Sequence, residues 1–380
     1  MLTQIKMENF LSFINETVID IKKTNYKLLE NNTYQNVLKG VSFFGENASG
    51  KTNALSSIKF LLDLLFVDKE IQFILYHCFY SKNNLTKMDY SFEIDNYNIN
   101  YNFVFDLEGI VEENLYINKK NIITRIGSNA KTYLLDNEEK YEDIDRSILF
   151  LRKIYFNTKF EGNQILKKWF TFLENSVYVN AFQHNAISYG KHNLQLNKYL
   201  KDNGIDSFQA FFDKYNFNFD LEYTNEIKNG NISFVEDEEK KALFFKRKGF
   251  DVALPFMFES LGNQTLLNLL PSLIHIVDNG GMLLIDEFSS GFHNDLEELI
   301  IKHFMKYSLN AQMFLVSHST NILSNSLLRP DQIYAVEFIG TKGSTVKRFS
   351  DEQPRAAQNL EKMYLGGVFG GIPQYDFTKE

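Results

Sequence analysis

The chain has 380 residues, a formal net charge of -8, 44% hydrophobic residues and 23% charged residues, which is ordinary for a globular protein with a sizeable core. Its negative charge argues against a protein coated in basic surface. Its single cysteine, Cys78, excludes an internal disulfide framework, and its apolar neighbours favour a buried thiol. We find no signal-peptide pattern and no long apolar window, so we expect a cytoplasmic protein without a membrane span.

The N-terminal region predicts two short strands at 2–6 and 16–21, then a buried strand at 40–44. A helix is expected at about 52–66, because apolar residues recur there at helical spacing and would pack on a sheet. The loop between strand and helix follows G-x-x-x-x-G-K-[ST], with Gly45, Gly50, Lys51 and Thr52 at the fixed positions.

This loop predicts a binding site for a nucleotide phosphate chain. Glycines let the backbone curl so that its N–H groups point at phosphate, and the helix N-terminus adds further donors. Lys51 would bind the β and γ phosphates, and Thr52 would ligate Mg²⁺. A chance glycine-rich turn is the alternative, but the flanking strand and helix disfavour it. The residues assigned to nucleotide binding here are Gly45, Asn47, Ala48, Ser49, Gly50, Lys51, Thr52 and Asn53.

The middle of the chain changes in character twice. From 89 to about 135, apolar and polar residues alternate with turn residues between them, which predicts an antiparallel β lobe beside the phosphate loop. From 145 to 223 we expect mainly helices, near 162–175, 194–203 and 207–215, with a high aromatic content. A helical core is the favoured interpretation of these aromatic residues, and base stacking is the alternative.

Two further strands are predicted at 232–235 and 242–246, with the charged run 236–241 between them as a solvated turn. The basic cluster Lys246-Arg247-Lys248 is favoured as a surface loop, with nucleic-acid binding as the alternative.

The C-terminal part returns to an α/β pattern and supplies the carboxylates. Residues 281–287 form an apolar run that ends in Asp286 and Glu287, placing both at the carboxyl end of a buried strand. Asp286 would hold Mg²⁺ opposite Thr52, and Glu287 would act as general base for the attacking water. A second buried strand at 314–317 ends in His318, which would face the γ-phosphate and orient the water or donate to phosphate.

Another candidate lies at 259–264, ESLGNQ, before a helix over 265–277 in which Pro271 must cause a kink or lie in the first turn. An ordinary helix start is the simple interpretation. Alternatively, Ser260 and Gly262 form a second phosphate-binding helix terminus that serves the nucleotide of a second subunit.

Together these motifs resemble the ABC-type ATPase head shared by SMC and RecF-like proteins. They are more similar still to the single-chain AAA-type ATPases of bacterial phage-defence operons, the RloA, AbiL and AriA kind. The matching segments are NFLSF at 9–13, GENASGKTN at 45–53, ESLGNQT at 259–265, LLIDEF at 283–288, LVSHSTNIL at 315–323, DQIY at 331–334 and YLGGVFGGIP at 364–373.

The sequence departs from the family pattern in three places. Asn263-Gln264 replaces the Gly-Gln pair of transporter ATPases, and 288–293 lacks the usual Leu-His-Pro turn. We could assign no glutamine-loop residue within 71–87.

The resemblance implies an α/β P-loop NTPase with an ABC-type head, an antiparallel β lobe and an inserted helical lobe. We predict head segments at 1–88 and 251–380, the β lobe at 89–144, and a mainly helical insertion that ends in a β hairpin at 145–250. The implied activity is ATP hydrolysis with Mg²⁺ by Lys51, Glu287 and His318 in a homodimer. The implied role is the sensor ATPase of an anti-phage or toxin–antitoxin-like system with a separate Toprim or RloB-like nuclease effector, since the chain leaves no room for a fused one.

Two alternatives stay open. A RecF-like DNA-repair ATPase would need a basic groove, which the net charge does not support. A weakly hydrolysing, ATP-gated scaffold that sequesters a toxin would show slow turnover and stable nucleotide-dependent assembly.

Overall fold

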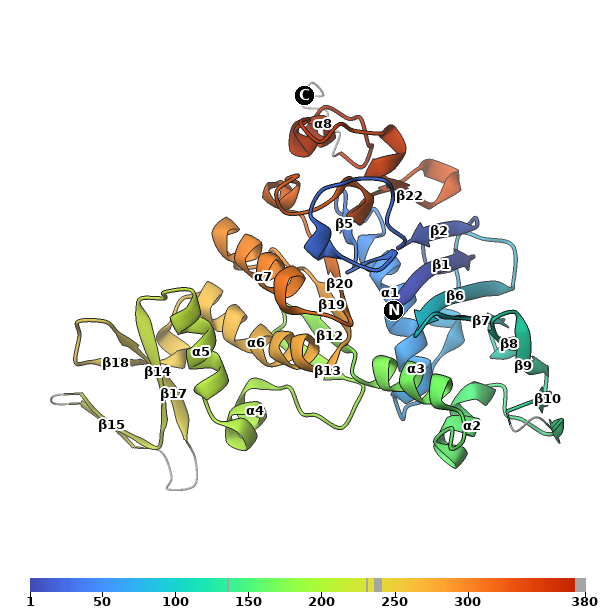
Figure 1. The fold of residues 1–380 in the computed structure, drawn as a ribbon, viewed down its shortest axis with the longest axis horizontal. Coiled ribbons are helices and arrows are strands. Elements are labelled where there is room, and N and C mark those ends of the chain that lie inside the picture. The colour runs from blue at the N-terminus through green and yellow to red at the C-terminus, as the bar shows by residue number, and fades with distance from the viewer. Residues whose placement is uncertain (135–136, 230–231, 236–240, 373–380) are drawn as a thin grey trace.

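Two β-sheets with one helix between them build the centre of the molecule, a computed structural model that describes residues 1–134, 137–229, 232–235 and 241–372 (Figure 1). Helix α1, Lys51–Phe66, follows the phosphate loop as predicted. It is buried on nearly all sides because a sheet covers it on two opposite faces. The sequence predicted one apolar stripe on this helix, packed on one sheet. The second sheet covers the opposite face, which explains why residues outside the stripe are buried as well.

The central sheet has the order β13-β12-β19-β20-β5-β21-β22. Strands β12, β19, β20, β5 and β21 run parallel, and β13 and β22 pair antiparallel at the edges. Their bounds are β13 Asn185–Ser188, β12 Val177–Asn180, β19 Gly281–Asp286, β20 Ala311–Val316, β5 Ser42–Phe44, β21 Ile333–Phe338 and β22 Ser344–Arg348. Strands from both ends of the chain thus share one sheet, and β12 and β13 from the middle of the chain extend it.

Alternating side chains of this sheet enter two separate cores. Met282 and Leu284 of β19 belong to the core around α1, whereas Leu283 and Ile285 belong to the core on the opposite face. Every residue of β19 is buried, as expected for a parallel strand covered on both faces. The helices over the second face are α6, Leu261–Asn279, and α7, Asn294–Tyr307. Pro271 lies in the interior of α6, so the first-turn alternative for it is wrong.

The predicted β lobe is confirmed as an antiparallel sheet of order β11-β10-β9-β8-β7-β6-β1-β2, on the right in Figure 1. Asp95 and Asn96 both have positive φ, as the tight β6–β7 hairpin turn requires. The bounds are β1 Leu2–Glu8, β2 Thr17–Asp20, β6 Thr86–Ile94, β7 Tyr97–Phe105, β8 Ile110–Ile117, β9 Lys120–Ile126, β10 Asn129–Thr132 and β11 Glu139–Tyr141. Strands β1 and β6 pair across the first predicted domain boundary, and the boundaries themselves stay predictions.

The region from 145 to 223 contains the three expected helices and features that the sequence did not predict. The helices are α2 Phe150–Thr158, α3 Gln164–Glu174, α4 Leu196–Asn203 and α5 Asp206–Lys214, of which α2 was not predicted. Strands β12 and β13 were also missed, because four-residue strands show too little alternation to be recognised. The aromatic residues of α3 and α5 are buried, which confirms the helical-core interpretation.

A smaller sheet, β14-β17-β18, lies on the left in Figure 1, beside the β15–β16 hairpin. The bounds are β14 Phe219–Thr224, β15 Glu226–Asn229, β16 Ile232–Val235, β17 Ala242–Arg247 and β18 Ala253–Pro255. The predicted strands at 232–235 and 242–246 are therefore found, whereas most of the predicted charged turn, 236–240, lies outside the described residues. Strands β3, Thr33–Tyr34, and β4, Val37–Leu38, form a further short hairpin.

The C-terminal segment packs back on the head through α8, Leu360–Leu365. The Phe369 ring stacks on Phe349 at a centroid distance of 3.7 Å, and the Tyr364 hydroxyl donates to the Gly371 carbonyl at 2.8 Å. Across the described ranges, no helix combines the length and apolar composition needed to cross a lipid bilayer.

Candidate nucleotide site

The phosphate loop joins β5 to α1 at the carboxyl end of the central sheet. Gly50 precedes α1 with φ of 108°, and a Cβ on it would lie 2.4 Å from Ser344 Oγ and 2.8 Å from Ser12 Oγ. Only glycine fits this position, because an L side chain would meet both the unfavourable backbone conformation and these two hydroxyls. Close packing under the loop therefore fixes its curvature.

Lys51 lies folded under this loop. Its Nζ donates to the carbonyls of Gly45 at 3.0 Å and Glu46 at 2.6 Å. Burial lowers the pKa of Lys51 to about 8, while the nearby carboxylates of Glu287 and Asp286 act in the opposite direction. A phosphate group placed here would offer this poorly solvated ammonium a stronger partner than two carbonyl oxygens.

Asp286 ends β19 and faces the first turn of α1. The Thr52 hydroxyl donates to Asp286 Oδ1 at 3.1 Å, and the Tyr178 hydroxyl reaches Oδ2 at 3.4 Å. Burial, followed by the adjacent charge of Glu287, raises the pKa of Asp286. Tyr178 comes from β12, one of the strands that the sequence did not reveal, so its contact was missed.

The pair Thr52–Asp286 fits Mg²⁺, which prefers hydroxyl and carboxylate oxygens together with phosphate and water. In the part of the chain that the structure describes, no group of three or more His, Cys, Asp or Glu side chains could hold a metal ion by itself. The protein ligands of Mg²⁺ would thus be few, and the remaining ones would come from nucleotide phosphates and water.

Glu287 adopts an unusual backbone conformation directly after β19. Its φ is 56°, a left-handed value that costs a non-glycine residue about 1–2 kcal/mol. The Ser290 N–H donates to the Glu287 carbonyl at 2.9 Å and the Phe288 N–H to the Val316 carbonyl at 2.9 Å, which ties this turn to the end of β20. Strain held at a candidate general base is typical of functional sites.

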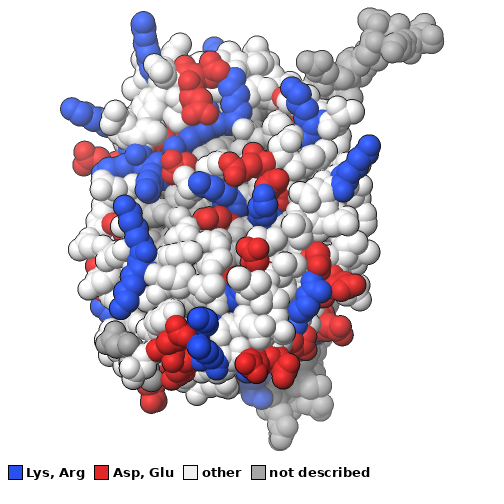
Figure 2. All heavy atoms as spheres, turned by 90° about the vertical axis from the view of Figure 1, so that its right-hand side faces the viewer, with Lys and Arg blue, Asp and Glu red and all other residues white. Residues whose placement is uncertain are grey.

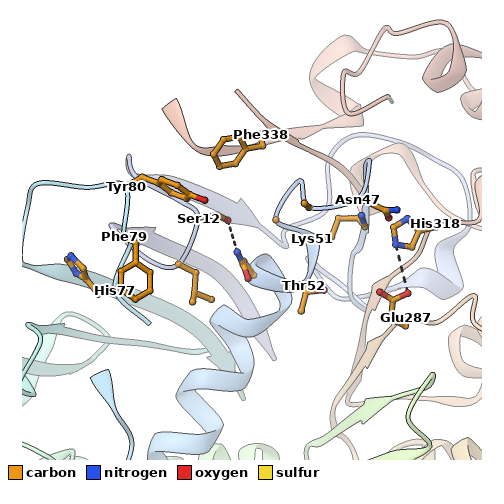
Figure 3. Close-up of a pocket in the computed structure, with 14 residues that line it drawn as sticks. Ser12, Asn47, Lys51, Thr52, His77, Phe79, Tyr80, Glu287, His318 and Phe338 are labelled. Carbon is orange, nitrogen blue, oxygen red and sulfur yellow. Dashed lines mark hydrogen bonds and ion pairs between the residues drawn. The ribbon is translucent and has the colours of Figure 1, made fainter. Parts of the chain in front are cut away.

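His318 follows β20, which lies between β19 and β5, so sheet order brings it to the same edge as predicted. Its Nε2 lies 3.9 Å from Glu287 Oε2, as Figure 3 shows. Burial and the charge of Lys51 lower the pKa of His318, so its imidazole is neutral at pH 7. A neutral imidazole can donate one hydrogen bond and accept another.

One cavity of about 430 Å³ joins these groups. Of the predicted nucleotide and catalytic residues, it is lined by Asn47, Ala48, Gly50, Lys51, Thr52, Asn53, Glu287 and His318. Ser49 is instead buried, and its carbonyl accepts a hydrogen bond from Ser344 Oγ at 2.7 Å. Asn53 Nδ2 donates to Ser12 Oγ at 2.7 Å, so the NFLSF segment supports the site.

Ser260 and Gly262 are not among the residues that line this cavity. Ser260 caps α6, with its Oγ accepting from the Asn263 N–H at 3.4 Å. A Cβ on Gly262 would lie 2.8 Å from the Gly291 carbonyl oxygen, so this helix start packs tightly on the segment that follows Glu287. Large apolar side chains are exposed around Ser260, with fractions of 67% for Met257, 65% for Phe258 and 60% for Leu261.

Residues 71–87, in which the sequence showed no glutamine-loop residue, contribute aromatic side chains to the lining of the cavity. Strand β12 is the element that borders Asp286, because Asn180 pairs with Asp286 and the Ala181 N–H donates to the Asp286 carbonyl at 3.0 Å. Gln183 follows at the same edge, exposed, with its N–H donating to Asn180 Oδ1 at 2.9 Å.

The basic cluster 246–248 does not form a patch of its own. Arg247 Nη2 contacts both carboxylate oxygens of Glu259 at 2.8 and 2.6 Å, and Lys246 lies 3.8 Å from Glu222. On the face of the molecule that carries the antiparallel sheet, basic and acidic side chains are interspersed (Figure 2). Neither surface resembles a continuous groove for a phosphate backbone.

The fold and this site define a P-loop ATPase domain with an ABC-type head. Three SMC heads have similar solved structures, each covering 91% of this chain. The head from Thermotoga maritima is 14% identical, with a TM-score of 0.50 and 98% of that chain covered. A head bound to the C-terminal winged-helix domain of ScpA is 15% identical, with a TM-score of 0.53 and 96% covered. The Pyrococcus furiosus head, with an extended coiled coil and the ScpA C-terminal domain, is 13% identical, with a TM-score of 0.53 and 95% covered.

The chain belongs to the family described as "AAA domain, putative AbiEii toxin, Type IV TA system", which matches residues 41–324. No curated protein sequence matches the chain.

Proposed function

We propose that this protein binds Mg-ATP and hydrolyses it to ADP and phosphate, using one site per chain. The observation that carries the proposal is the convergence of Lys51, Thr52, Glu287 and His318 on one cavity, with Asp286 hydrogen-bonded to Thr52 at its edge. These residues lie at or just beyond the carboxyl ends of three neighbouring strands, β19, β20 and β5, with Lys51 and Thr52 in the first turn of α1. Their chemistry matches what phosphoryl transfer to water requires.

Each side chain has a distinct role in this proposal. Lys51 binds the β and γ phosphates, and Thr52 and Asp286 hold Mg²⁺, which would neutralise phosphate charge when bound. Glu287 accepts a proton from the water that attacks the γ-phosphorus. His318, neutral and 3.9 Å from Glu287, donates to the γ-phosphate or orients that water.

We further propose that two chains associate head to head around two ATP molecules. Ser260 and Gly262 lie outside the cavity of their own chain and are surrounded by exposed apolar side chains, which favours a surface that a second chain covers. In this arrangement Ser260 and the N-terminus of α6 would contact the γ-phosphate held by the partner. Gln183, at the edge of the sheet beside Asp286, is our candidate for the glutamine-loop residue.

The biological role that we propose is that of the sensor ATPase in an anti-phage or toxin–antitoxin-like system, of the RloA, AbiL and AriA kind. The family description, which names a toxin–antitoxin system, supports it. A separate effector of the Toprim or RloB-like nuclease kind would then act with the chain in the cytoplasm. The described structure offers no observation that favours the DNA-repair alternative.

The test compares the native mass and phosphate release of the wild type, Glu287→Gln and Lys51→Ala with and without Mg-ATP. We expect the wild type to release phosphate, and Glu287→Gln to bind ATP, release little phosphate and accumulate as a dimer. Lys51→Ala should stay monomeric with ATP. If the wild type releases no phosphate but still assembles with ATP, the proposal of an enzyme is wrong and the ATP-gated scaffold takes its place as the interpretation.

A further inference from the structure

The C-terminal segment, residues 356–372, includes α8, which lies at the top of Figure 1. It contains most of YLGGVFGGIP, a motif that none of the roles proposed above uses. None of the described residues of this segment lines the nucleotide cavity. The segment nevertheless contacts two parts of the site from outside, namely the residues that follow His318 and the start of the phosphate loop.

The first contact lies just after His318. The Thr320 hydroxyl donates to Glu361 Oε1 of α8 at 2.7 Å, and hydrogen bonds to an ionised acceptor are the stronger kind. Asn325 Nδ2 donates to two backbone carbonyls of the C-terminal segment, at 3.0 and 2.6 Å. Residues 317–319 belong to no helix or strand, so side-chain bonds of this kind set the path of the chain there.

The second contact lies at the start of the phosphate loop. Phe44 directly precedes Gly45, and its ring packs edge-on against Tyr364, with centroids 6.5 Å apart at 63°. The Tyr364 hydroxyl donates to the Gly371 carbonyl at 2.8 Å. Gly371 has φ of 71°, and a Cβ on it would lie 3.6 Å from Gly45 Cα and 3.2 Å from the Val336 carbonyl oxygen. The backbone of the C-terminal segment therefore packs directly against the loop.

Both contacted parts must keep their positions for ATP to be hydrolysed. His318 Nε2 lies 3.9 Å from Glu287 Oε2, and a displacement of about 1 Å at such a group can lower the rate about a hundredfold. The C-terminal segment offers firm support, because Phe349, Tyr364 and Phe369 are all buried and Phe369 stacks on Phe349. Packed residues outside a site are what keep its reacting side chains in place.

We propose that the C-terminal segment positions the ATPase site from outside the cavity. Glu361 acts on His318 through Thr320, and so affects the chemical step. Tyr364 acts on the phosphate loop through Gly371, and so affects nucleotide binding. This inference rests on the proposed function, since it requires ATP to be hydrolysed in that cavity.

The first arm of the test measures kcat and KM from phosphate release by the full chain with Mg-ATP. Glu361→Ala should lower kcat about tenfold and leave KM within about twofold, because it releases the chain after His318 and leaves the phosphate loop in place. Glu361→Gln should recover most of kcat, since its amide oxygen can still accept the Thr320 hydroxyl. Thr320→Val should match Glu361→Ala, with no further loss in the double variant. Lys362→Ala, at an exposed position of the same helix, is the matched control.

The second arm measures binding of Mg-ATP and Mg-tripolyphosphate by isothermal titration calorimetry. Tyr364→Phe should weaken the binding of both ligands about fivefold, because it removes the hydrogen bond to Gly371 and loosens the loop that holds the phosphates. Tyr26→Phe is the matched control, since the Tyr26 hydroxyl also donates to a backbone carbonyl, that of Pro354 at 3.0 Å, outside the C-terminal segment.

Failure of this inference differs from failure of the proposed function. If the wild type hydrolyses ATP and Glu361→Gln is as slow as Glu361→Ala, or the losses in the double variant add, the Thr320–Glu361 bond does not position His318. If Tyr364→Phe binds both ligands as tightly as the Tyr26→Phe control, the segment does not position the phosphate loop. A wild type that releases no phosphate contradicts the proposed function itself, and the inference with it.

Discussion

Replacing Arg247 by methionine should destabilise the protein and weaken its ATP-dependent association, because Arg247 holds the residue that precedes the helix of Ser260. Arg247 Nη2 contacts both carboxylate oxygens of Glu259, whose side chain is only 3% exposed. Glu259 Oε1 in turn accepts the Ser260 N–H at 2.8 Å. The ion pair thus links strand β17 of the small sheet to the start of α6.

The size of the effect follows from the burial of the two partners. Removing one partner of a fully buried ion pair costs about 3–5 kcal/mol, because the other charge stays behind without compensation. The Arg247 side chain is 36% exposed, so water can partly replace it and the expected loss falls to about 1–3 kcal/mol. Methionine keeps an apolar stem but also removes the guanidinium that lies over the Phe219 ring, 5.3 Å from its centroid.

The assay is a double-mutant cycle of Arg247→Met and Glu259→Gln, with the free energy of unfolding taken from urea titrations. Glutamine can still accept the Ser260 N–H and carries no charge. We therefore expect the Arg247→Met loss to shrink in the Glu259→Gln background, with a coupling energy of about 1–2 kcal/mol. Native mass with Mg-ATP should show weaker dimerisation for Arg247→Met alone.

The matched control is Lys246→Met, on the same strand. Lys246 lies 3.8 Å from Glu222, with both side chains about two-fifths exposed (43% and 39%), so this change should alter stability by no more than about 0.5 kcal/mol. Equal losses for the two variants, or an Arg247→Met loss that is the same with and without Glu259, would refute the reasoning.

Three further predictions concern the loop, the metal ligand and acid stability. Gly50→Ala should weaken Mg-ATP binding at least about tenfold in calorimetry, and Ser344→Ala should restore part of it by removing the hydroxyl 2.4 Å from the new Cβ. Tyr178→Phe should lower phosphate release several-fold and raise the Mg²⁺ concentration needed, with ATP affinity unchanged, because it removes the 3.4 Å contact to Asp286. His303 has its pKa lowered from 6.5 to about 4 by burial, so the unfolded chain binds the proton first and stability falls as pH drops from about 6.5 to 4. Urea titrations of His303→Gln should lack this contribution of about 3 kcal/mol, and an unchanged acid slope would contradict it.

Short motifs and strong periodicity were enough to identify the phosphate loop, the carboxylates and the β lobe. The glycines and Lys51 of the loop predict a phosphate site, because few other residues can adopt the backbone curl that such a loop requires. Asp286 and Glu287 could be placed at a sheet edge because the apolar run before them indicates a buried strand. Apolar and polar residues alternate regularly over its long strands, so the antiparallel sheet could also be predicted from the sequence.

The sequence could not show which distant segments meet at the site. Strand β12 has four residues, too few to display a period, yet its position beside β19 brings Tyr178 to Asp286 and Gln183 to the same edge. Phe338 and Tyr80 are far apart in the chain, yet their ring centroids lie 5.5 Å apart. Local patterns encode which residues form a strand or helix, whereas sheet order depends on how all the apolar faces are covered together, and only the tertiary structure decides that.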